Sequence, residues 1–191
     1  MNNRYWMIGL LVIMAVICSS SLAFVNYKTS PVIERNREIT SMRTVLDVFG
    51  ISYDIENSDS IIETYKQRII EREVEKLKLF NEMESGATAV SLSGSGFQGP
   101  ISIVVALDGK TISGFKVVEQ RETPGLGARI TEQEFQDSFI GKNASGGLAM
   151  IKSGNAGLRE FDAITGATET SKALEKIFER GFKRYFEVVV K

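Results

Sequence analysis

The chain has 191 residues, with 23 basic and 24 acidic side chains and a net charge of −1. This balance gives no support for nucleic-acid binding, which needs a concentrated basic surface. The absence of histidine excludes histidine-based acid–base catalysis, and the single cysteine, Cys18, excludes disulfides and four-cysteine iron–sulfur sites within the chain. Any redox chemistry therefore requires an organic cofactor.

Residues Tyr5 to Val25 carry no charge. As a helix, this stretch would measure roughly 31 Å, close to the thickness of a bilayer core. Aromatic residues at both ends suit membrane interfaces, so we predict a transmembrane anchor over residues 1–27. The alternative is a cleaved signal peptide, with Ser21-Leu22-Ala23 as the cleavage site.

Residues 28–86 are predicted to form a helical juxtamembrane region. A first helix follows Pro31 and stops at Gly50, and a second runs from about Asp59 to Phe80. The charges of the second helix alternate in sign, which favours a solvated surface with salt bridges between turns. A partner-docking surface is the alternative.

From Ala87 onward the apolar pattern changes to that of strands. We predict strands at 88–92, 101–107, 111–118 and 148–152, with a hairpin turn at Asp108-Gly109. A short helix over 130–139 carries a possible capping box, Thr131 with Glu134. A helix starts near Thr168, and a strand over 186–190 ends the chain. These elements predict an α+β domain over 87–191, with a mainly antiparallel sheet and flanking helices.

One glycine-rich stretch, Gly94–Gly99, matches the pattern G-x-G-x-x-G. A dinucleotide-binding fingerprint must open a helix after a strand, whereas here Pro100 and another predicted strand follow. We therefore interpret this stretch as a turn that leads into the sheet.

The segment Asp162–Ser171 places three threonines and a serine around Gly166 and Ala167, where a loop meets the last predicted helix. Two interpretations follow from the residues alone. The hydroxyls cap the helix, or the free N–H groups and the positive end of the helix dipole bind a phosphate.

The order Asp162-Ala163-x-Thr165-Gly166-Ala167-Thr168-x-Thr170 resembles the flavinylation motif of the FMN-binding domain family. This family includes the RnfG and NqrC subunits of bacterial respiratory complexes. The resemblance implies that Thr168 carries FMN through a phosphoester bond. The family more often has serine where this chain has Thr165, and both residues are small and carry a hydroxyl. Backbone N–H groups and the hydroxyls of Thr165, Thr170 and Ser171 can solvate the linked phosphate.

A second block, Glu122-Thr123-Pro124-Gly125-Leu126-Gly127, resembles the loop that approaches the flavin ring in the same family. Pro124-Gly125 is a strong turn dipeptide, so backbone here can come close to a flat ring. Thr123 and Leu126 would pack nearby. Glu122 either bonds to the polar edge of the ring or is a solvated loop carboxylate. The resemblance also places the aromatic Phe97 near the flavin.

The resemblance implies an electron-transfer subunit of a membrane-bound, ion-translocating oxidoreductase of the Rnf type (ferredoxin:NAD⁺). Such a protein is a non-autonomous subunit of a redox-driven translocase, with FMN as covalent cofactor and no metal. Its partners are the other subunits and, during maturation, a flavin transferase. The implied location is the inner membrane, single-pass, with the C-terminal domain on the extracytoplasmic (periplasmic) side. The alternatives are an NqrC-like subunit of a Na⁺-pumping NADH:quinone reductase, a free-standing extracytoplasmic flavoprotein, or a flavin-free anchored protein.

Overall fold

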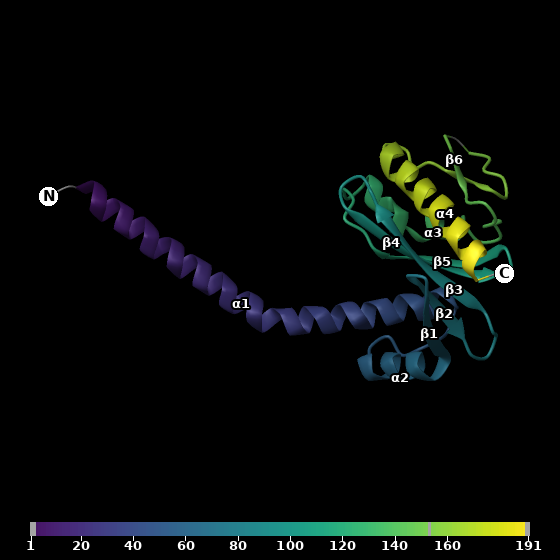
Figure 1. Ribbon diagram of the computed structural model, residues 1–191, viewed down its shortest axis with the longest axis horizontal. Coiled ribbons are helices and arrows are strands. Elements are labelled where there is room, and N and C mark those ends of the chain that lie inside the picture. Colours follow the sequence, from purple (N-terminus) through teal and green to yellow (C-terminus); the bar gives the residue numbers. More distant parts are fainter. Residues whose placement is uncertain (1–2, 153, 190–191) are drawn as a thin grey trace. The chain divides into compact units, whose positions relative to one another are not determined.

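The computed structural model describes residues 3–152 and 154–189 and divides the chain into two compact units, 1–39 and 40–191 (Figure 1). The first helix, α1 (Asn3–Val48), begins in the first unit and ends in the second. Its apolar part has a mean hydropathy of 2.5 and none of it is buried, so it is long and apolar enough to cross a membrane. A signal sequence near the N-terminus would meet the same criterion.

The last turns of α1 belong to the second unit, where Val45, Leu46 and Val48 are buried. The helix stops where predicted, but it does not begin after Pro31 as predicted, because α1 continues through that residue. Gly50 takes the left-handed conformation (φ +67°), and the N–H of Ile51 donates to the carbonyl of Leu46. Glycine allows this backbone geometry at a helix end without steric cost.

The predicted helix over 59–80 is wrong in its second half. Helix α2 (Ser58–Arg68) is capped by the Asn57 side chain, but a hairpin of β1 (Ile69–Val74) and β2 (Leu77–Glu82) follows. Its two-residue turn, Glu75-Lys76, has positive φ at both positions. Leu77 and Leu79 alternate into the core, which is a strand pattern. The alternating charges mislead because they also pair across strands, as Glu71 does with Lys78 at 2.9 Å.

The main sheet is an antiparallel meander in the order β1-β2-β3-β4-β5, which confirms the predicted α+β class (Figure 1). Its remaining strands are β3 (Thr88–Ser95), β4 (Pro100–Asp108) and β5 (Thr111–Glu119). The glycine-rich stretch forms the β3–β4 turn, where the N–H of Gly96 donates to the carbonyl of Gly99. Gly109, with φ +59°, lies in the predicted β4–β5 turn.

The segments after β5 combine short helices with a small parallel sheet. Helix η1 (Gly127–Thr131) and helix α3 (Gln133–Asp137) replace the single predicted helix. The capping box is wrong, because the Thr131 hydroxyl donates back to the carbonyl of Ala128. Strand β6 (Ala149–Ile151) pairs in parallel with β7 (Glu160–Asp162), a strand that the sequence did not indicate.

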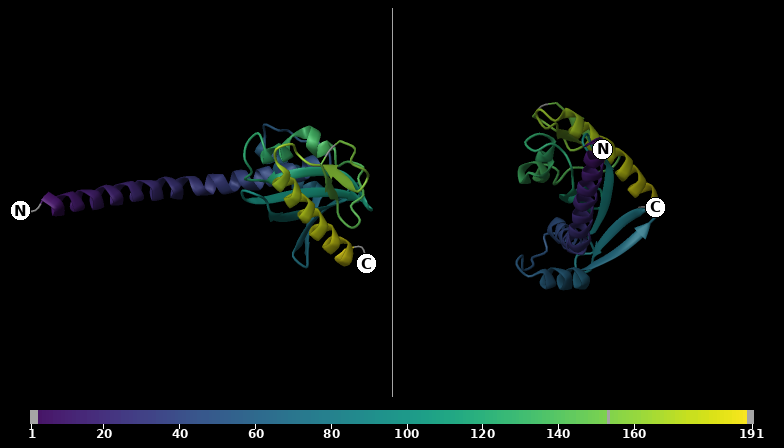
Figure 2. Two further views of the ribbon diagram at one scale, coloured as in Figure 1. Left: turned by 90° about the horizontal axis from the view of Figure 1, so that it is seen from above. Right: turned by 90° about the vertical axis from the view of Figure 1, so that its left-hand side faces the viewer.

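Helix α4 (Thr168–Val188) covers one face of the sheet and packs on β3 (Figures 1 and 2). The predicted strand over 186–190 is wrong as far as the structure describes it, because this helix continues to Val188. Two glycines permit the close approach. A Cβ added at Gly94 would lie 2.6 Å from Ile177, and one added at Gly181 would lie 2.6 Å from Leu92. Beneath α4, Phe178 forms an aromatic cluster with Phe115, Phe139, Phe161 and Phe182.

A buried carboxylate, Glu82, fixes the end of β2. It accepts hydrogen bonds from Arg68 and from the N–H groups of Glu84 and Ser85. Burial alone would raise the pKa of Glu82, but the hydrogen bonds from Ser85, Glu84 and Arg68 outweigh it and lower the pKa to about 2.

We predict that Glu82 stabilises the fold above its ordinary pKa and that this contribution is lost as the pH falls from about 4.5 to about 2. At pH 7, Glu82→Gln should lower the unfolding free energy by about 1–3 kcal/mol, because donors around the carboxylate lose their charged acceptor. Denaturant unfolding of the full chain in detergent at a series of pH values measures both effects. Equal acid sensitivity in wild type and variant would contradict the assignment.

Candidate functional site

Thr168 is the first residue of α4, and its side chain is exposed. The residue before it, Ala167, occupies the N-cap position and offers no side-chain acceptor. The first helical bond runs from the N–H of Ser171 to the carbonyl of Ala167. The N–H groups of residues 168–170 therefore have no partner within the helix, and the helix dipole adds positive potential at the same place.

The two hydroxyl residues that follow are buried and have structural partners. Ser171 accepts a hydrogen bond from the N–H of Ile164 and donates to the carbonyl of Ala167. Thr170 donates to Glu122 Oε2 at 2.6 Å. Neither hydroxyl caps the helix, so the capping interpretation of this hydroxyl-rich segment is wrong.

Glu122 is only 5% exposed and joins three segments of the chain. Its Oε2 accepts from Thr170 on α4, and its Oε1 accepts from the N–H of Gln98 in the β3–β4 turn at 3.0 Å. Of the two interpretations of Glu122 from sequence, a solvated loop carboxylate does not fit this burial. Its side chain holds the turn, the loop and the helix start together.

The loop after Glu122 turns sharply and returns to α4. The N–H groups of Leu126 and Ala128 both donate to the carbonyl of Thr123, and Gly125 has φ +75°. At Gly127 an added Cβ would collide with the Thr170 hydroxyl and with the Glu122 side chain. Glycine is therefore required for this contact between loop and helix.

These segments enclose a hollow of about 310 Å³, which we call the Thr168 cavity. It brings together residues of both sequence motifs and the aromatic side chain of Phe97, although roughly forty residues of chain separate the two motifs. The residues that line it are Phe97, Glu122, Thr123, Leu126, Gly127, Gly166, Ala167, Thr168, Glu169 and Thr170.

Four of the predicted site residues do not line this cavity. Pro124 and Gly125 form the exposed turn of the loop, and Ser171 is buried below it. Thr165 lies with Asp162 in a separate hollow of about 250 Å³.

Glu169, by contrast, lines the cavity and was not predicted from the sequence. Its position next to Thr168 in the first turn of the helix could have identified it as a site residue. Its carboxylate pairs with Lys172 at 2.8 Å on the exposed surface.

Comparisons with known proteins identify the family. Residues 96–183 match the model of the FMN-binding domain. The chain is 30% identical to the G subunit of a Na⁺-translocating ferredoxin:NAD⁺ oxidoreductase complex from Acetobacterium woodii, over 86% of this chain and 83% of that protein. The chain belongs to the FMN-binding domain family, as a relative of these G subunits.

A second relative is 39% identical over 47% of this chain. It is the G subunit of a proton-translocating ferredoxin:NAD⁺ oxidoreductase complex from Clostridium ljungdahlii, and the match spans about half, 48%, of its length. Among solved structures, the C subunit of a Na⁺-translocating NADH-quinone reductase from Parabacteroides distasonis superposes with a TM-score of 0.66. That superposition covers 81% of this chain and 94% of the other at 23% identity, so this likeness shows the shared fold.

We predict that Thr168 and Thr170 differ sharply in their effect on stability. Thr170→Val leaves the buried Glu122 carboxylate without one of its donors and should lower the unfolding free energy by about 1–3 kcal/mol. Thr168→Val, the matched change in the same helical turn, removes an exposed hydroxyl and should change it by less than about 0.5 kcal/mol. Denaturant unfolding of unflavinylated full-length protein compares them. Equal losses would contradict the structural role of Thr170.

Proposed function

We propose that the chain is a membrane-anchored electron-transfer subunit that carries FMN on Thr168 through a phosphoester bond. The observation that carries this proposal is the exposed Thr168 hydroxyl in the wall of a cavity formed by two motifs of the FMN-binding domain family. When bound, the flavin supplies redox chemistry that no side chain of this protein provides.

The residues around Thr168 fit both parts of the cofactor. The N–H groups that open α4 suit the phosphate, which keeps a negative charge after esterification. The exposed side chains of Phe97 (64%) and Leu126 (44%) suit the flat apolar ring. The positive φ of Gly166 turns the backbone just before the attachment point.

Burial supports Thr168 over its neighbours as the attachment point. The hydroxyls of Thr170 and Ser171 are buried and already hydrogen-bonded, so a bulky transferase could not reach them. Thr165 is exposed but lies in the other hollow. In the reaction, Thr168 Oγ forms a bond to the phosphorus of an activated flavin nucleotide, and the leaving group departs with the hydroxyl proton. We assign the base that accepts this proton to the flavin transferase.

We further propose an Rnf-type complex, ferredoxin:NAD⁺ oxidoreductase, as the assembly in which this protein works. The similarity to the Acetobacterium woodii protein over most of both chains supports it. Membership of an NADH:quinone reductase complex and a free-standing flavoprotein are the alternatives. The proteins that co-purify with the full-length chain from mild detergent distinguish the three.

We predict that coexpression with a flavin transferase adds to the full-length chain the mass of FMN less one water molecule. Thr168→Ala should abolish this addition, and Thr165→Ala, which removes the other exposed hydroxyl of the motif, should keep it. Intact-mass measurement and in-gel flavin fluorescence after denaturation give the result. An unmodified wild type, or a modified Thr168→Ala variant, would overturn the attachment.

We also predict that α1 is retained as a single-pass anchor with the second unit outside the cytoplasm. A cysteine introduced at exposed Asp162, in a Cys18→Ser background, should react in intact cells with a membrane-impermeant maleimide. The Cys18→Ser parent is the control and should not react. Labelling only after lysis would contradict the sidedness, and release of the protein into the soluble fraction would contradict the anchor.

A further inference from the structure

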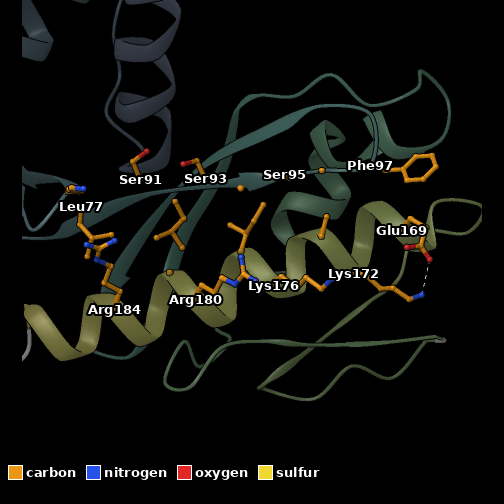
Figure 3. A pocket seen from close by; sticks show the side chains of 17 residues that line it. Leu77, Ser91, Ser93, Ser95, Phe97, Glu169, Lys172, Lys176, Arg180 and Arg184 are labelled. Carbon is orange, nitrogen blue, oxygen red and sulfur yellow. Dashed lines mark hydrogen bonds and ion pairs between the residues drawn. The ribbon is translucent and has the colours of Figure 1, made fainter.

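Another hollow, of about 520 Å³, lies between α4 and β3 and is strongly basic. We call it the basic groove. Four of its cations follow one another on α4 at intervals of four residues: Lys172, Lys176, Arg180 and Arg184 (Figure 3). Lys76 from the β1–β2 turn adds a fifth, and Glu169 is the one acidic residue in the lining.

Most of these cations have no acidic partner. Lys172 pairs with Glu169, whereas Lys76, Lys176, Arg180 and Arg184 form no ion pair with any residue in 3–152 or 154–189. Like charges spaced four residues apart along one helix flank repel one another. Their accumulation beside a hollow indicates an anionic occupant.

The other wall of the groove is a strand edge. Strand β3 pairs with β4 as far as Ser95, but its pairing with β2 ends at Ser91, because β2 begins just after the β1–β2 turn. Residues 92–95 are therefore paired on one side only. Ser91 and Ser93 point away from α4 in Figure 3, so backbone rather than hydroxyl groups borders the groove. An unpaired edge is a template for an added strand.

The spacing of the cations matches such a strand. Four residues of helix rise about 6 Å, and two residues of an antiparallel strand rise about 6.8 Å. The packing of α4 on β3 displays this match directly. Leu92 lies against Gly181 and Gly94 against Ile177, so two strand residues correspond to four helix residues. A strand added beside β3 would place every second side chain opposite successive cations.

We propose that the basic groove binds an extended segment of a partner protein with acidic residues at alternate positions, added as a strand to residues 92–95 of β3. An anionic membrane surface fits less well, because lipid headgroups have no peptide backbone that could pair in register with the strand edge. Phe97 and Glu169 line both the groove and the Thr168 cavity, so the segment would end beside the cavity. Only this last consequence, a partner held next to a flavin, rests on the proposed function.

The test uses the full-length chain in phosphatidylcholine nanodiscs and a fluorescein-labelled peptide of alternating threonine and glutamate residues, about eight in all, which is long enough to span the unpaired edge. Fluorescence anisotropy should show saturable binding. The double variant Lys176→Glu/Arg180→Glu should weaken it at least about tenfold. The control Lys183→Glu/Lys110→Glu changes the net charge equally at exposed positions outside the groove and should leave affinity within about twofold.

Three further measurements make the outcome decisive. A probe methylated on alternate backbone nitrogens along one edge should lose binding, and its unchanged affinity would overturn strand addition. Vesicles containing phosphatidylserine that bind the protein through Lys176 and Arg180, without peptide binding, would overturn the proposal in favour of a lipid surface. The Thr168→Ala variant should bind the peptide normally, which separates this proposal from flavin attachment.

Discussion

The hydrogen bond between Thr170 and Glu122 organises the site. It joins residues 48 positions apart and buries a carboxylate whose other oxygen holds the β3–β4 turn through Gln98. A buried carboxylate without donors is strongly destabilising, so the loop, the turn and the helix start must come together for any of them to be stable. Thr168 can then remain exposed, because its buried neighbours and not Thr168 itself hold the helix start in place.

Much of the fold followed from sequence, because its strands alternate regularly and glycine marks its turns. The strands over 88–118 and the start of α4 near Thr168 were predicted on this basis. The β1–β2 hairpin was missed because its charges suit a helix as well as a sheet, and because its turn uses Glu75 and Lys76 in place of glycine. Strand β7 was missed because three residues that pair only with β6 leave no periodic signal.

The candidate site shows the same division. Motif resemblance brought Glu122–Gly127 together with the segment around Thr168, and the structure places both around one cavity. The motif resemblance selected Thr168 and left the other three hydroxyls of that segment one shared role around the phosphate, whereas packing separates them. Thr170 and Ser171 are buried and form hydrogen bonds within the protein. Thr165 lies in a neighbouring hollow. Thr168 alone of the four lines the cavity with an exposed side chain. Without the resemblance the free hydroxyl could not be identified from the residues, because its exposure depends on tertiary contacts.

Thr168 and Ile177 lie nine residues apart in the same helix, α4, and Ile177 packs against Gly94. Inserting or deleting one residue between them would rotate the threonine by about 100° around the helix axis, away from the cavity. The number of residues between Thr168 and Ile177 therefore fixes the direction in which Thr168 faces. Relatives that share the geometry should vary freely in loop length elsewhere and yet keep this count unchanged.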